Sequence, residues 1–96
     1  MSDSFKNVYN SKSKFLQRYI VSILQYNKRE DFIREVLYRA WRMYPSKRIS
    51  FDKVREYLDA KFTDAEMQII LTEKEKLASI KRLQKNHSEN YENYGY

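Results

Sequence analysis

The chain has 96 residues and a formal net charge of +6, and 42% of its residues are hydrophobic, which allows one globular domain at most. One glycine, one proline and no cysteine favour an all-α fold and exclude disulfides, thiolate metal sites and a cysteine nucleophile. The positive charge suggests an acidic partner, such as a protein, nucleic acid or anionic lipid.

The first segment, residues 1–12, is interpreted as an N-terminal extension. It is rich in serine and lysine, and Asp3 is its only acidic residue. This composition weakly resembles an organellar targeting segment, although the shortage of arginine counts against one. Residues 13–28 then carry apolar side chains at a 3–4 spacing, which predicts an extra helix before the main domain. Its apolar positions are Leu16, Tyr19, Ile20, Ile23 and Leu24.

The next helix is predicted from about residue 29 to Pro45. Asn27 is a plausible cap, so we expect a short break before this helix rather than a bend. Pro45 ends the helix because the residue before a proline is pushed out of the α region. Leu37 lies on the apolar stripe and is expected in the core, and the core is also favoured for Trp41. The stripe consists of Phe32, Ile33, Val36, Leu37, Ala40, Trp41 and Tyr44.

Two further helices follow. Ser50 is expected to cap the first, whose apolar set is Phe51, Val54, Tyr57, Leu58 and Phe62. Thr63 begins the second, where "TDAE" predicts a capping box between Thr63 and Glu66. The apolar stripe of this last helix is interrupted by Lys74 and consists of Met67, Ile70, Leu71, Leu77, Ile80 and Leu83. Residues 87–96 have no periodicity and are expected to form a disordered or extended tyrosine-rich tail.

Positive charge is concentrated between residues 34 and 55. Seven basic residues stand there against two acidic ones, Glu35 and Asp52. A hydroxyl and guanidinium groups within one helical turn, followed by further cations, suit a partner rich in carboxylates or a phosphodiester. A basic helix face that is only solvated remains the alternative. The predicted binding residues are Tyr38, Arg39, Arg42, Lys47, Arg48, Lys53 and Arg55.

Catalysis, membrane insertion and nucleic-acid binding are not expected. The only histidine, His87, lies in the polar tail, and Glu73 with Glu75 reads as an ordinary solvated pair. No apolar run reaches the ~20 residues that a membrane span needs. The last two helices superficially resemble a helix-turn-helix, but Asp64 and Glu66 would face phosphates. An RNA contact through residues 39 to 55 stays open as an alternative.

The motif order over residues 32–84 resembles the LYR-motif family of mitochondrial proteins. It comprises "VLYRAW" with the triad Leu37-Tyr38-Arg39, a proline soon after, "KVRE", "TD" and a helix reaching "IKRLQ". The likeness is greatest to the branch of accessory subunits on the matrix arm of respiratory complex I, at the mitochondrial inner membrane. The chain has Tyr57 and Leu58 where the family usually has a phenylalanine. Assembly factors for iron–sulfur or respiratory enzymes, and subunits of the organellar ribosome, are the alternative branches.

The resemblance implies a three-helix LYR domain, here residues 29–86. In the family, such a domain binds the mitochondrial acyl carrier protein, whose 4'-phosphopantetheine arm inserts an acyl chain between the helices. The chain is therefore expected to have no cofactor of its own and to join other subunits of a large respiratory complex. Residues that could line an acyl channel, or could simply pack together, are Val36, Ala40, Val54, Leu58, Ile70 and Leu71.

Overall fold

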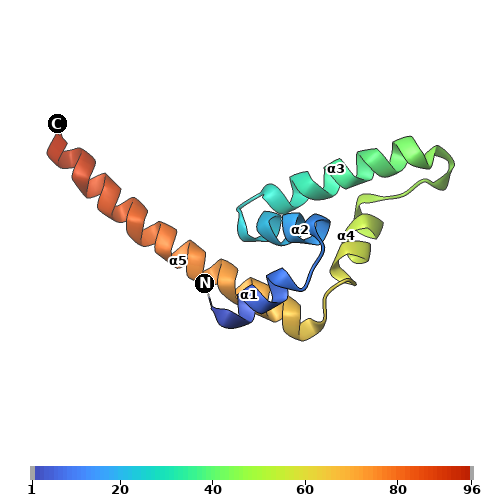
Figure 1. The fold of residues 1–96 in the computed structure, drawn as a ribbon. Helices are drawn as coiled ribbons and strands as arrows, with labels where there is room; N and C mark the ends of the chain where they lie inside the picture. The colour runs from blue at the N-terminus through green and yellow to red at the C-terminus, as the bar shows by residue number, and fades with distance from the viewer. Residues whose placement is uncertain (1, 96) are drawn as a thin grey trace.

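The computed structural model describes the backbone of residues 2–95 and the side chains of residues 2–80. Within the described residues the chain is all-helical and has no strand, so the predicted fold class is confirmed (Figure 1). None of the described helices is long and apolar enough to cross a membrane. In chain order, the elements are α1 (Asp3–Asn10), α2 (Lys14–Leu24), α3 (Lys28–Met43), the 3-10 helix η1 (Pro45–Lys47), α4 (Phe51–Asp59) and α5 (Asp64–Gly95).

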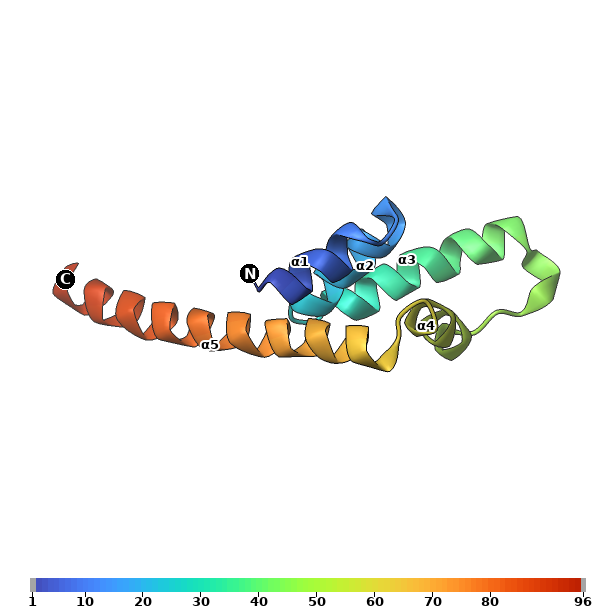
Figure 2. The ribbon, with the colours of Figure 1, turned by 60° about the horizontal axis from the view of Figure 1, so that its bottom comes forward.

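Helix α1 lies within the segment that was interpreted as an extension, and the sequence pattern did not predict it. The Ser2 hydroxyl accepts a hydrogen bond from the Phe5 amide at 3.2 Å and so caps the first turn. Phe5 and Val8 are buried, with 2% and 7% of their surface exposed. The helix packs against α5 and α2 (Figure 2). Two apolar side chains on an eight-residue helix are too few to show a helical periodicity in the sequence. A helix this short is stable only through its packing against other helices.

Hydroxyl caps fix the starts of α2, α4 and α5. Ser13 and Ser50 accept hydrogen bonds from the amides three residues later, at 3.3 and 3.2 Å. The Thr63–Glu66 capping box is confirmed, with reciprocal bonds of 3.0 and 2.9 Å. The Thr63 amide, and secondly a hydrogen bond from Lys12, lowers the pKa of Glu66. The local sequence therefore determines where α2, α4 and α5 begin.

The break between α2 and α3 is confirmed, but the capping role expected for Asn27 is wrong. Asn27 occupies the N-cap position of α3 without any side-chain capping bond. Its backbone is left-handed, with φ of 64°. Asparagine tolerates this conformation better than most residues, so Asn27 acts through its backbone in the tight turn.

The core joins all five helices. Leu37 is 5% exposed and belongs to it, as predicted. The side chains with no exposed surface are Tyr19, Ile20, Ile23, Leu58 and Ile70. Since three of these come from α2, the helix before the expected three-helix domain is an integral part of the core.

A polar cluster at the edge of this core links α2, α3 and α4. The Arg29 guanidinium binds both carboxylate oxygens of Asp59, at 2.8 and 2.9 Å. The Tyr19 hydroxyl donates to Asp59 and accepts a hydrogen bond from Arg29 Nε at 3.1 Å. Burial, and secondly the hydrogen bond to Asp59, raises the pKa of Tyr19 to about 12. The three side chains satisfy one another where the helices meet.

The raised pKa of Tyr19 should make the protein less stable in alkali. An unfolded tyrosine loses its proton near pH 10, whereas folded Tyr19 keeps it to about pH 12. The unfolded state is therefore favoured as pH rises, and we expect the free energy of unfolding to fall by about 2 kcal/mol between roughly pH 9 and 12 from this group. Urea unfolding of the wild type and of Tyr19→Phe would measure it. A parallel fall in both proteins would contradict the assignment.

Helix α5 continues well beyond the packed body. The C-terminal half projects away from the other helices, and the molecule measures 59 × 32 × 19 Å (Figures 1 and 2). The predicted tail lies on this projecting part, where the backbone continues α5 as far as Gly95. The tyrosine side chains of the predicted tail, residues 87–96, lie outside the described side chains.

Candidate docking surface

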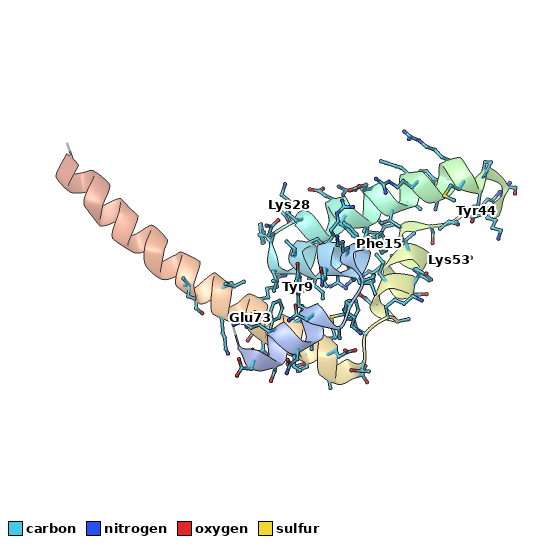
Figure 3. The ribbon with its side chains drawn as sticks, viewed as in Figure 1. Tyr9, Phe15, Lys28, Tyr44, Lys53 and Glu73 are labelled. Carbon is cyan, nitrogen blue, oxygen red and sulfur yellow. The ribbon has the colours of Figure 1, made fainter. Side chains whose placement is uncertain are left out.

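Six of the seven predicted binding residues lie on the second half of α3, on the connection through η1 and on the first turn of α4, whereas Arg55 lines a hollow beside Tyr26 and Asn27 of the α2–α3 turn. We call the seven together the α3–α4 basic surface, and all seven side chains are exposed. Figure 3 shows Tyr44 at the far end of α3 and Lys53 on α4, away from α1 and the N-terminal part of α5. The members of this surface are Tyr38, Arg39, Arg42, Lys47, Arg48, Lys53 and Arg55.

Arg39 is the member whose charge is partly neutralised. Its guanidinium lies 3.3 Å from a carboxylate oxygen of Glu35, one helical turn earlier. The same carboxylate binds Arg18 of α2 at 3.3 Å. Sequence reasoning missed Glu35 as a partner, although the spacing of four residues on a helix indicates such a pair.

The remaining cations of the surface have no such neutralisation. None of the ion pairs among the side chains of residues 2–80 includes them. The uncompensated positive charge is therefore centred on the last turn of α3 and on α4, beyond the Tyr38–Arg39 step. The five unneutralised cations are Arg42, Lys47, Arg48, Lys53 and Arg55.

Aromatic side chains lie among these cations. The rings of Tyr38 and Trp41 are 5.6 Å apart at 46°, and the two side chains are 54% and 43% exposed. The Lys47 ammonium lies 5.1 Å from the centre of the Tyr44 ring. The preference for Trp41 in the core is wrong, because nearly half of its side-chain surface is exposed. Exposed aromatic rings beside arginine are typical of binding hot spots.

Trp41 also holds the loop that carries two of the cations. Its indole N–H donates to the carbonyl oxygen of Ile49 at 2.7 Å. Between these residues, Arg48 has a left-handed backbone with φ of 43°, which is uncommon for a side chain of this type. The hydrogen bond fixes the return of the chain towards α4 and so positions Lys47 and Arg48 beside the end of α3.

The predicted channel residues divide into two groups. Val54, Leu58 and Ile70 are buried in the core, with at most 5% of their surface exposed. Val36, Ala40 and Leu71 are half-buried. None of the six lines any of three surface hollows, of about 190, 280 and 480 Å³. Their role in holding an acyl chain stays a prediction.

The interpretation of Glu73 and Glu75 as a solvated pair is wrong for Glu73. Glu73 is 5% exposed, whereas Glu75 is exposed. The difference arises because position 73 of α5 faces the N-terminal end of α1, which the sequence pattern did not predict (Figure 3). Among the described residues, no group of three or more histidine, cysteine or acidic side chains could hold a metal ion.

No protein-family model matches the chain, and no curated protein or solved structure matches it. The resemblance to the LYR-motif family therefore depends on the motif order in residues 32–84 alone.

Proposed function

We propose that the chain is a non-catalytic docking module that binds an acidic protein through the α3–α4 basic surface. The observation that carries this proposal is the exposed Tyr38–Trp41 pair on α3, followed by Arg42 on the same helix and by Lys47 and Arg48 in the loop that Trp41 holds. None of these cations forms an ion pair among the side chains of residues 2–80. Their positive charge is available for carboxylates on another protein.

The two kinds of side chain would contribute differently to binding. The cations raise the association rate and orient the partner, because their long side chains stay at the rim of an interface. The aromatic rings supply affinity when they are buried. The Trp41 indole already donates its N–H to Ile49, so covering Trp41 would leave no polar group without a partner.

The family resemblance supplies the partner that we propose: a mitochondrial acyl carrier protein, which is small, helical and strongly acidic. On this proposal the chain is an accessory subunit of respiratory complex I at the matrix side of the inner membrane. The carrier would provide the 4'-phosphopantetheine arm and its acyl chain. Leu58 and Ile70 have no exposed surface, so an acyl chain could enter beside them only if the helices packed over them moved apart.

Calorimetric titration of the purified chain with an acyl carrier protein tests the partner. We expect saturable 1:1 binding, and a stopped-flow association rate that falls as salt is added, because screening removes long-range attraction. An association rate that does not change with salt would contradict an electrostatic interface. The absence of any binding would exclude the acyl carrier protein as partner.

A single-stranded RNA is the alternative ligand, because bases can stack on exposed rings while cations hold phosphates. The same titration with an oligouridylate of matched charge separates the two. We expect the oligonucleotide to bind more weakly than the acyl carrier protein at the same salt concentration. Tighter binding of the oligonucleotide would favour the RNA alternative.

A further inference from the structure

The largest of the three hollows lies between the N-terminal end of α1 and one face of α5. It has a volume of about 480 Å³, and most of its lining is apolar. Ser2 contributes to it from the start of the chain, and Ile69, Thr72, Glu73 and Lys76 contribute from α5. These residues are separate from the α3–α4 basic surface, so any role of this hollow goes beyond the proposed function.

Glu73 is the unusual feature of this hollow, because a glutamate is rarely so deeply buried unless it has a cationic partner. It is 5% exposed and contributes to the hollow's lining. Its Oε1 accepts one long hydrogen bond, 3.5 Å from the Ser2 amide. Its other carboxylate oxygen accepts no hydrogen bond from residues 2–80 and is open to the hollow, because no buried side-chain oxygen among the described residues lacks a partner.

Among the side chains of residues 2–80, no basic group forms an ion pair with this carboxylate, although Lys76 lies on the same hollow. The N-terminal end of α1 offers only partial positive charge. A carboxylate that is nearly removed from water binds a cation more strongly than an exposed one does, because the surrounding dielectric is low.

We propose that the hollow between α1 and α5 binds an ammonium group on an apolar stem, with Glu73 as its counter-ion. The carboxylate would accept hydrogen bonds from the ammonium, and the apolar stem would lie against Ile69 and Ala65. An alkylamine and the lysine side chain of another protein share this chemistry. Thr72 and Ser4, which also line the hollow, offer hydroxyl acceptors for the remaining ammonium protons.

The test compares two probes that share a stem and differ in charge, hexylammonium and 1-hexanol. Binding would be measured by chemical-shift titration of the wild type, of Glu73→Gln and of the matched control Glu75→Gln. Glutamine keeps the size of the side chain and an acceptor for the Ser2 amide, so the variant should fold. Glu75 is exposed on the same helix and does not line the hollow. Both variants remove one negative charge.

We expect hexylammonium to bind the wild type and Glu75→Gln at least about tenfold more tightly than 1-hexanol, the worth of a charge-assisted hydrogen bond. Glu73→Gln should bind both probes alike. Equal binding of the two probes by the wild type, or preference for the amine retained in Glu73→Gln, would overturn the proposal. A blocked lysine peptide and its norleucine analogue show which ammonium group the hollow binds. Tighter binding of the lysine peptide than of the norleucine peptide indicates a protein lysine. Equal binding of the two peptides, together with binding of hexylammonium, indicates a free alkylamine.

Discussion

Replacing Leu58 with alanine should lower the free energy of unfolding by about 3 kcal/mol. Leu58 has no exposed surface and packs in the core that joins all five helices. Removing a buried isobutyl group loses its transfer free energy and leaves a cavity that the surrounding helices fill only in part, which together cost about 2–5 kcal/mol. In a chain of 96 residues this is a large fraction of the total stability.

This substitution also tests the interpretation of Leu58 as an acyl-channel residue. Urea unfolding would compare Leu58→Ala with Tyr57→Ala, a control at the neighbouring position, which is 59% exposed. The control should cost less than about 1 kcal/mol, as substitutions at exposed sites usually do. If Leu58→Ala costs no more than this control, Leu58 faces open space in the free protein, and the packed core described above would be wrong.

Reversing two cations of the α3–α4 basic surface should weaken binding of the acidic partner about a hundredfold. Arg42→Glu and Lys53→Glu each turn an attraction into a repulsion, and a loss of about 1.4 kcal/mol for each corresponds to a factor of ten. Neither residue forms an ion pair among the described side chains, and both are exposed. The fold should therefore be unaffected, which circular dichroism can verify.

The matched control for this variant is the double reversal Lys6→Glu and Lys14→Glu. These exposed lysines, on α1 and α2, take part in none of the ion pairs among residues 2–80 and lie outside the basic surface. The control changes the net charge equally, so it should reduce affinity only through long-range attraction, by much less than the first variant. Equal losses in the two variants would show that net charge, rather than a particular surface, determines binding.

Local signals explain what the sequence predicted well. A serine cap or a capping box involves residues three positions apart, so Ser50 and the Thr63–Glu66 pair could be recognised without any tertiary information. The burial of Leu37 follows in the same way from helical periodicity. The concentration of cations between residues 34 and 55 was also visible, because charge that is close in sequence on a helical hairpin stays close in space.

Features that depend on distant elements could not be predicted. The burial of Glu73 requires α1, whose two apolar anchors give no recognisable pattern. The exposure of Trp41 depends on how far α3 extends beyond the helices that pack against it. The bonds from Arg29 and Tyr19 to Asp59 join residues 30 and 40 positions apart. By contrast, the Glu35–Arg39 ion pair could be predicted from its spacing of four residues on a helix. Because this pair partly neutralises Arg39, the remaining positive charge is centred nearer to Arg42.

The most direct test of the docking proposal is amide hydrogen–deuterium exchange of the chain alone and in complex with the acyl carrier protein. The proposal predicts slower exchange in the partner-bound state over the second half of α3, η1 and the first turns of α4, with α1 unchanged. Protection confined to α1, α2 or the projecting part of α5, with none around Trp41 and Arg42, would contradict it.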